Sequence, residues 1–92
     1  KYKAEASKAK IAEVEKAFAA LEKKITEIKA FEKGTNNSPE GLNKGFKHCY
    51  LITFGSEKDR DVYLVHPAHK EFVKVVGPVV EDVFVVDYWA TK

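Results

Sequence analysis

Residues 83–90, with the sequence VFVVDYWA, constrain the fold of this 92-residue chain more than any other segment. They are almost all apolar, and polar side chains do not alternate with them. A strand covered on both faces shows this pattern, whereas a strand with one face in water alternates. We therefore predict a buried strand here, in a sheet with material on both of its faces.

An amphipathic helix is predicted from Ser7 to about Lys24. Its apolar side chains recur at steps of three and four residues, which places one stripe on the helix: Ile11, Val14, Phe18, Leu21 and Ile25. Ser7 suits the N-cap position, and Lys23 suits the negative C-terminal end of the helix dipole. This helix is expected to lay its stripe against the sheet.

Two further strands are predicted at residues 25–33 and 46–54. The segment between them, GTNNSPEGLNKG at residues 34–45, concentrates Gly, Asn, Ser and Pro, as surface loops do. The second strand, FKHCYLITF, is rich in aromatic and β-branched residues. One of its faces carries Phe46, His48, Tyr50, Ile52 and Phe54, and the other carries Cys49, Leu51 and Thr53. We expect both faces to be buried.

Residues 56–80 are predicted to be helical in two pieces. Ser56 is placed to cap the first piece, and Pro67 opens the second, because proline is favoured in the first turn of a helix. The apolar side of the second piece is formed by Phe72, Val75, Val76 and Val79. Gly77 and Pro78 weaken its last turn.

The predicted order is helix, strand, strand, helix, strand. Residues 1–3, KYK, lie where the end of a preceding strand would lie. Restoring that strand gives an α+β fold of the ferredoxin-like βαββαβ type, in which the first strand is truncated or missing here. We treat residues 1–92 as one domain, and we expect several apolar residues, with another pocket histidine among them, upstream of Lys1.

One sheet face remains without cover in this arrangement. Both helices lie in a single layer, and the chain has no further element for the opposite face. An uncovered apolar surface usually marks a partner site, and a twofold dimer is the commonest closed solution. The expected partner is therefore a second copy of the chain, packed through the open sheet face.

Composition and charge exclude several classes of protein. Sixteen basic residues against 14 acidic ones give a net charge of +2, and the two signs are interspersed. Nucleic-acid binders need a clustered basic excess, so we expect no nucleic-acid partner. No apolar run reaches the roughly 20 residues that span a bilayer. The single cysteine, Cys49, excludes an intramolecular disulfide and favours a cytoplasmic location.

Several motifs together resemble a known family. They are the Gly-aromatic-x-His opening at Gly45 to His48, the Tyr-x-x-His-Pro-x-His run from Tyr63 to His69, the loop GTNNSPEGLNKG, and the terminal Asp87 with its following tyrosine. In this combination they resemble the stress-responsive dimeric α/β-barrel (Dabb) family over essentially the whole chain. The N-terminus departs from the family pattern, because only KYK remains of the first strand.

The resemblance implies a ferredoxin-like monomer, a dimer that closes a β-barrel, and a pocket between sheet and helices. Most members of the family have no assigned reaction. The chain is also similar to plant polyketide cyclases of the olivetolic acid cyclase type, which perform an intramolecular aldol condensation without a cofactor. The resemblance assigns the chemistry to Tyr63 and His69 and places His48 in the pocket wall.

An aldol step needs a base near neutral pKa and a donor to the enolate oxygen. His69, in the first turn of a helix, suits the base because the helix dipole opposes a positive charge there. Tyr63 suits the donor. Each histidine also has a structural alternative. His69 can simply pack against its neighbours, and His48 can be a core histidine whose hydrogen bonds are satisfied. His66 can bond to the backbone at the start of the helix, in which case contact with a ligand in the pocket is its secondary role.

A metal site is weighed as well. His66 and His69 are three residues apart and can share one side of a helix. A third ligand would have to come from His48, Asp82 or Asp87, and zinc sites need three or four convergent ligands. We expect neither a metal nor a cofactor.

Three functions therefore compete. The first is a small-molecule-binding domain, with cofactor-free cyclase or lyase activity as an extension. The second is a non-enzymatic, stress-associated structural dimer, and the third a cofactor-free monooxygenase of related fold, which fold analogy alone would support. An enzyme needs a cavity of about 300 Å³ or more that reaches His69 and Tyr63. Large side chains in that space, such as those of Phe18, Phe31 and Phe72, argue against it.

Overall fold

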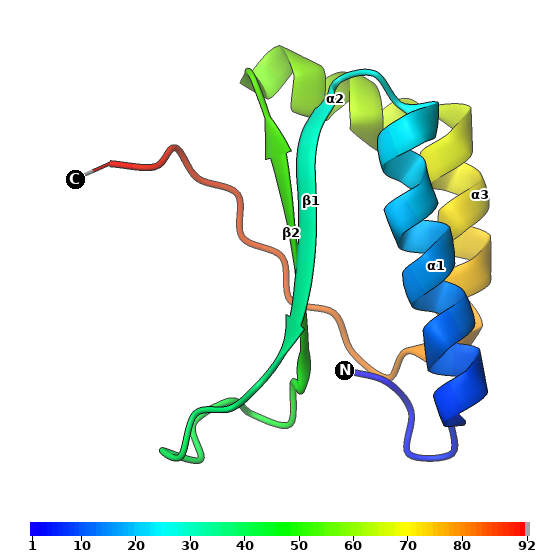
Figure 1. The fold of residues 1–92 in the computed structure, drawn as a ribbon, viewed down its shortest axis with the longest axis vertical. Coiled ribbons are helices and arrows are strands. Elements are labelled where there is room, and N and C mark those ends of the chain that lie inside the picture. Colours follow the sequence, from blue (N-terminus) through cyan, green and yellow to red (C-terminus); the bar gives the residue numbers. More distant parts are fainter. Residues whose placement is uncertain (92) are drawn as a thin grey trace.

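The computed structural model describes residues 1–91 as a layer of helices on one face of a two-stranded antiparallel sheet (Figure 1). In chain order the elements are α1 (Lys8–Lys24), β1 (Ile28–Thr35), β2 (His48–Phe54), α2 (Glu57–Val65), α3 (Pro67–Val76) and the short 3₁₀ turn η1 (Gly77–Val79). Near the N-terminus, Tyr2 forms an isolated antiparallel bridge with Val80. This is the ferredoxin-like α+β arrangement that the sequence predicts.

Helix α1 forms where the apolar stripe predicts it. The Ser7 hydroxyl accepts a hydrogen bond from the backbone N–H of Lys10 at 3.1 Å and so caps the first turn. Val14 and Leu21 are buried on the inner face of the helix, and Ile25, just beyond its end, is fully buried. The predicted helix is confirmed.

The strands are shifted slightly from their predicted bounds. β1 begins three residues later than expected and continues through Gly34 to Thr35, and β2 begins at His48. The register pairs Phe31 with Ile52, and the two strands carry a bulge between Ile28 and Ala30. The connecting loop turns through Gly41 and Gly45, which adopt φ angles of +70° and +82° that glycine tolerates without strain.

The two-piece helix is also confirmed. The Ser56 hydroxyl caps α2 by accepting from the backbone N–H of Asp59 at 3.0 Å. His66 leaves the helical conformation with φ −65° and ψ 137°, and Pro67 then starts α3. The break at His66 lets α3 turn back along α1.

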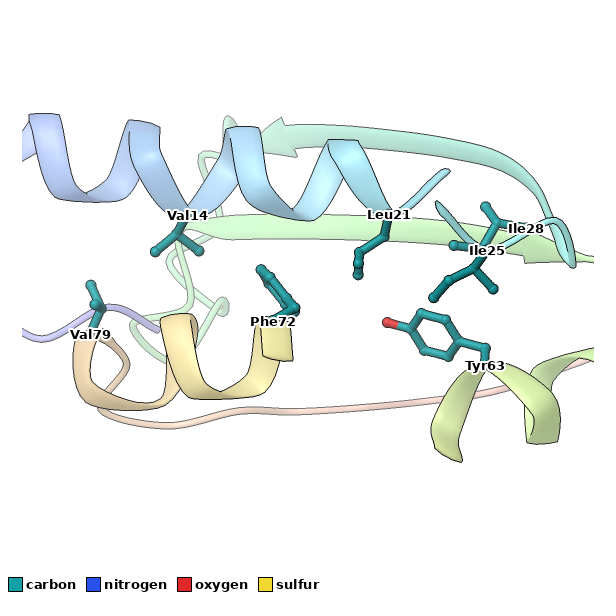
Figure 2. Close-up of a cluster of buried hydrophobic side chains, with 7 residues drawn as sticks. All are labelled: Val14, Leu21, Ile25, Ile28, Tyr63, Phe72 and Val79. Atoms are coloured by element: carbon teal, nitrogen blue, oxygen red, sulfur yellow. The ribbon is translucent and has the colours of Figure 1, made fainter. Parts of the chain in front are cut away.

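The core lies between the helical layer and the sheet (Figure 2). Its buried members come from α1, the start of β1, α2, α3 and η1: Val14, Leu21, Ile25, Ile28, Tyr63, Phe72 and Val79. Partly buried side chains, including Phe18, Ile52 and Phe54, extend this cluster across the sheet. The core therefore joins both layers. Within it, Tyr63 packs against Phe54, the last residue of β2.

The prediction of a C-terminal strand is wrong for the single chain. Residues 83–90 are extended but join no strand, and Phe84, Val85 and Trp89 are 76%, 74% and 59% exposed. A strand is defined by its ladder of hydrogen bonds, and β2 pairs only with β1 among the described residues. The apolar composition predicts that both faces of this segment are buried, but in the single chain its side chains remain exposed.

The outer face of β2 is likewise open, against the expectation that both faces are buried. Cys49, Leu51 and Thr53 are exposed, while His48, Tyr50, Ile52 and Phe54 face the helices and are partly buried. The helical layer covers one face of the sheet only. In the part of the chain that the structure covers, no helix has both the length and the apolar character needed to cross a membrane.

Candidate functional site

Tyr63 and His69 lie together where α2 meets α3. Their ring centroids are 4.2 Å apart with an interplanar angle of 38°, and Tyr63 also packs against Phe54 at 5.1 Å. The break at His66 makes this contact possible, because it folds the first turn of α3 back toward the last turn of α2. The structure thus brings together the two residues for which the sequence predicts chemistry.

The hydrogen bond of His69 fixes its tautomer. Nδ1 lies 3.2 Å from the carbonyl oxygen of Leu64. A carbonyl oxygen only accepts, so Nδ1 carries the proton in the neutral ring and Nε2 carries the lone pair. The site therefore offers an imidazole nitrogen that can accept a proton, on a side chain that is partly exposed.

Tyr63 remains protonated at neutral pH. It is 7% exposed, and burial, with a smaller contribution from the negative charge of Asp87, raises the pKa of its hydroxyl to about 12. A neutral tyrosine hydroxyl is a hydrogen-bond donor. In Figure 2 its oxygen points away from α2, toward the core between the two layers.

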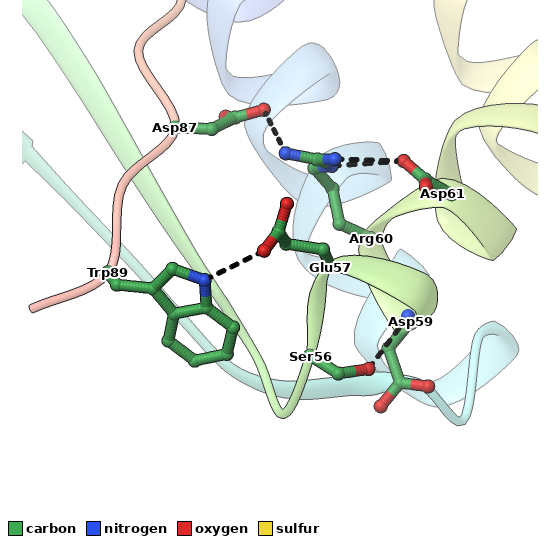
Figure 3. A network of polar contacts seen from close by, with 7 residues as sticks. All are labelled: Ser56, Glu57, Asp59, Arg60, Asp61, Asp87 and Trp89. Atoms are coloured by element: carbon green, nitrogen blue, oxygen red, sulfur yellow. Dashed lines mark hydrogen bonds and ion pairs between the residues drawn. The ribbon is translucent and has the colours of Figure 1, made fainter.

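Asp87 is held near this site by Arg60 of α2. An Arg60 guanidinium nitrogen lies 3.5 Å from Asp87 Oδ2, and the same guanidinium contacts Asp61 at 3.0 Å (Figure 3). Two residues further on, the Trp89 indole N–H donates to Glu57 Oε2 at 3.0 Å. These contacts attach the C-terminal segment to the start of α2.

His66 acts as a helix cap. Its Nδ1 accepts a hydrogen bond from the backbone N–H of Ala68 at 3.0 Å. This matches the alternative in which the imidazole bonds the backbone at the start of the helix. The ring nitrogen used for the cap is not available to a ligand.

His48 lies elsewhere. His48 begins β2, and Phe54, which packs against Tyr63, ends it. The Cα atoms of His48 and Phe54 are therefore roughly 20 Å apart at the usual strand rise. The ring of Tyr2 meets the His48 ring edge-on at 4.8 Å. The structure therefore does not bring His48 together with Tyr63 and His69.

A polar cluster around Glu15 surrounds His48 instead. The buried Nδ1 of His48 has no hydrogen-bond partner and lies 3.9 Å from Glu15 Oε2. The Tyr50 hydroxyl donates to the same oxygen at 3.3 Å and lies 2.6 Å from the Tyr2 hydroxyl, and Lys33 pairs with Glu15 Oε1 at 3.3 Å. Burial raises the pKa of Tyr50, and the neighbouring Tyr2 and Glu15 raise it further.

Sequence reasoning did not identify this cluster. Glu15 lies four residues after Ile11 and three before Phe18, so it interrupts the apolar stripe of α1. A charged residue inside a buried stripe is the one pattern that could have revealed it.

Aromatic rings fill the space between sheet and helices where the sequence predicts a pocket. Phe18 lies at the centre of this group, with ring centroids 4.4 Å from Phe72, 5.0 Å from Tyr50 and 5.1 Å from Phe31. This packing argues against a preformed cavity there. A cleft of about 380 Å³ lies instead between residues 51–54 of β2 and residues 86–90, and neither His69 nor Tyr63 lines it.

Metal-binding residues do not converge within residues 1–91. No group of three or more His, Cys, Asp or Glu side chains in that range is arranged to hold an ion. The groups that the site itself supplies are the His69 imidazole, the Tyr63 phenol and the carboxylate of Asp87.

The family can now be assigned. The sequence model of the stress-responsive A/B barrel (Dabb) domain matches residues 1–90. The chain belongs to this family. It is 37% identical over 83 residues to the stress-response A/B barrel domain-containing protein HS1 of Arabidopsis thaliana, a match that spans 90% of this chain and 76% of HS1. The family expected from the Tyr63–His69 motif is confirmed, while the likeness to polyketide cyclases stays a prediction.

Two solved structures extend the comparison. The hydroxynitrile lyase of Passiflora edulis superposes with a TM-score of 0.93 at 29% identity, over all of this chain and 87% of the lyase. A dimeric ferredoxin-like protein of unknown function from Thermobifida fusca superposes with a TM-score of 0.70 at 20% identity, over 89% of this chain and 76% of that protein. The second likeness establishes the ferredoxin-like fold.

Proposed function

We propose that this chain is a cofactor-free lyase that breaks or forms a carbon–carbon bond next to a hydroxyl-bearing carbon. The observation that carries the proposal is the contact between the His69 ring and the buried, protonated Tyr63. The Leu64 carbonyl bonds to Nδ1 of His69, so the lone pair on Nε2 takes no part in that hydrogen bond. The similarity to a hydroxynitrile lyase supports the same class of reaction.

The proposed step needs only these two side chains. His69 Nε2 takes the proton of the substrate hydroxyl, the oxygen forms a carbonyl, and the adjacent carbon–carbon bond breaks with its electron pair leaving on the departing carbon. Tyr63 donates a hydrogen bond to the oxygen as charge develops on it. Formation of the carbon–carbon bond in an aldol reaction is the reverse of such a cleavage, so the cyclase-type chemistry expected from the sequence belongs to the same class.

Because aromatic rings fill the space between sheet and helices, a substrate would have to reach the pair from the side on which His69 is exposed, or by rearrangement of the aromatic group around Phe18. Rings that fill a core move only together with their neighbours, so a ligand would replace one set of aromatic contacts with another. This favours a small, partly aromatic substrate over a large flexible one.

Activity on a hydroxynitrile tests the proposal. Wild-type protein should release benzaldehyde from mandelonitrile, followed by absorbance. His69→Ala and Tyr63→Phe should each lower kcat/KM by about tenfold or more, because the first removes the base and the second removes the hydrogen-bond donor. Lys70→Ala, next to His69 and exposed, is the matched control and should retain the activity. Wild-type protein that neither cleaves the compound nor gains thermal stability from it would contradict the proposal.

A second function, a structural homodimer, is favoured by the open sheet face. Leu51 is 42% exposed on that face, next to Cys49 and Thr53, and the Thermobifida fusca protein of this fold is dimeric. Burial of such a face would remove apolar surface from water in both copies. A dimer is compatible with the lyase, and it becomes the whole function if the lyase test fails.

Sedimentation tests the dimer. At low micromolar concentration the wild-type chain should sediment as twice its mass of 10.4 kDa. Leu51→Glu should shift it to the monomer, because each copy would then bury an unpaired charge in the interface. Val73→Glu, on the outer side of α3 and also exposed, should leave the dimer intact. A wild-type species of 10.4 kDa alone would exclude the sheet-to-sheet dimer.

A further inference from the structure

A buried imidazole nitrogen at the start of β2 is left without a hydrogen bond. Within residues 1–91, Nδ1 of His48 is shielded from solvent and has no hydrogen-bond partner. A carboxylate lies just beyond hydrogen-bond reach, because Glu15 Oε2 is 3.9 Å from this nitrogen. A buried polar atom without a partner destabilises a fold, so a state in which Nδ1 bonds to Glu15 would be favoured.

The Glu15 carboxylate is held in position by other groups. The Tyr50 hydroxyl donates to Oε2 at 3.3 Å, and the Lys33 ammonium pairs with Oε1 at 3.3 Å. Tyr50 has one hydroxyl hydrogen and gives it to Glu15, so the contact of 2.6 Å with Tyr2 is made by the Tyr2 hydroxyl donating to the Tyr50 oxygen. This chain of hydroxyls ends on the carboxylate oxygen that faces His48.

The His48 ring is confined as well. Tyr2 packs edge-on against it, with ring centroids 4.8 Å apart. The titratable groups around the ring therefore come from three segments: Glu15 from α1, Tyr2 from the N-terminal residues and Tyr50 from β2 itself. A fourth, Lys33 of β1, acts on the ring through the carboxylate that it shares.

The charge of the imidazole decides whether the gap closes. A protonated ring carries hydrogens on both nitrogens, so Nδ1 could donate to Glu15 Oε2 in a charge-assisted hydrogen bond, which is stronger than a neutral one. Burial opposes the charge, but the His48 and Glu15 side chains both remain 21% exposed, so the loss of hydration is partial. Lys33 opposes it too, and its side chain is 50% exposed, so water screens its effect.

The pair connects the two elements that enclose the aromatic group. Glu15 lies in the middle of α1 and His48 begins β2, so a bond between them ties the helix to the sheet. Phe18 follows Glu15 by three residues on the same face of α1, and its ring packs 5.0 Å from that of Tyr50 on β2. A bond between Glu15 and His48 would therefore oppose any separation of α1 from β2 at this ring.

We propose that Glu15 and His48 form a proton-operated latch that fastens α1 to β2. Protonation of His48 closes the latch through a hydrogen bond from Nδ1 to Glu15 Oε2, and loss of the proton opens it. Histidine side chains ordinarily titrate near about pH 6.5. The charged pair exists only in the folded chain, so its contribution to stability is present below this range and is lost as the pH rises through it. The latch does not depend on the lyase chemistry of Tyr63 and His69.

Urea denaturation of wild type and Glu15→Gln at about pH 5.5 and about pH 8 tests the proposal. Glutamine keeps the shape and an acceptor oxygen for Tyr50, but it cannot form the ion pair. Relative to wild type, its equilibrium constant of unfolding should rise about tenfold more at the acid pH than at the alkaline one. The lost contact with Lys33 cancels in this comparison, because lysine is charged at both pH values.

Glu13→Gln is the matched control. Glu13 lies on the same helix and pairs with Lys10 at 3.5 Å on the surface, so its unfolding constant relative to wild type should be the same at both pH values. Amide hydrogen exchange gives a local readout of the latch. At the acid pH, amides of α1 should exchange about tenfold faster in Glu15→Gln than in wild type, and this difference should nearly disappear at the alkaline pH.

His48→Gln provides a second test that holds even if Glu15→Gln does not fold. It removes the titrating ring, so its unfolding constant relative to wild type should also rise about tenfold more at the acid pH. An equal ratio at both pH values would overturn the proposal. A smaller ratio at the acid pH would overturn it too, because it would show that burial disfavours the charged ring more than Glu15 favours it. A Glu13→Gln protein with the pH dependence of Glu15→Gln would assign the effect to overall charge and would likewise overturn the latch.

Discussion

Replacement of Phe72 with alanine is expected to lower the free energy of unfolding by about 3–5 kcal/mol. Phe72 is 7% exposed on α3 and packs 4.4 Å from Phe18, the ring through which α1, β1, β2 and α3 contact one another. The change removes a buried ring and leaves a cavity that the rigid aromatic neighbours cannot fill. Urea denaturation followed by circular dichroism, at one fixed protein concentration, measures the loss.

Val73→Ala is the matched control for this prediction. Val73 is the next residue of the same helix and is 48% exposed, so its truncation should change the unfolding free energy by no more than about 0.5 kcal/mol. A Phe72→Ala protein as stable as Val73→Ala would mean that the aromatic group is not the centre of the core.

The helices could be predicted from the sequence because their determinants are local. The stripe on α1, the Ser7 cap and the break before Pro67 each depend on residues within one or two turns of each other. Such a pattern shows which face of a helix is buried even when the element that packs against it is not known. The structure accordingly has the same helices, with bounds close to the predicted ones.

The C-terminal strand could not be predicted correctly, because a strand depends on a distant partner. The composition of residues 83–90 indicates that they need cover, but it does not say which edge pairs with them. In the single chain the nearest edge is separated from them by a cleft. The same non-local dependence accounts for the exposed outer face of β2.

The candidate site was predictable in part for the same reason. Tyr63 and His69 are six residues apart, and the helix break between them is a local feature, so their contact follows from the motif. Glu15 and His48 are brought together only by the packing of α1 on β2. The aromatic group that fills the expected pocket also arises from four separate elements, and no single segment indicates it.

Alkaline pH is expected to destabilise the protein in a way that Tyr63→Phe partly removes. Below pH 10, Tyr63 is protonated in both the folded and the unfolded chain, so its ionisation does not lower the free energy of unfolding there. Between about pH 10 and 12 the hydroxyl ionises in the unfolded chain only, because burial and Asp87 raise its pKa to about 12 in the folded one. The folded state then loses up to about 2–3 kcal/mol relative to the unfolded state, and above pH 12 no more is lost.

The comparison between variants isolates this effect from the titration of lysines, which all forms share. Unfolding free energies measured by urea denaturation from pH 8 to 12 should fall less steeply for Tyr63→Phe than for wild type. Phe72→Leu removes no titrating group, so it should lower the curve by a constant amount and leave its slope unchanged. Parallel curves for wild type and Tyr63→Phe would show that Tyr63 ionises alike in both states, and its hydroxyl would then not be buried as the structure has it.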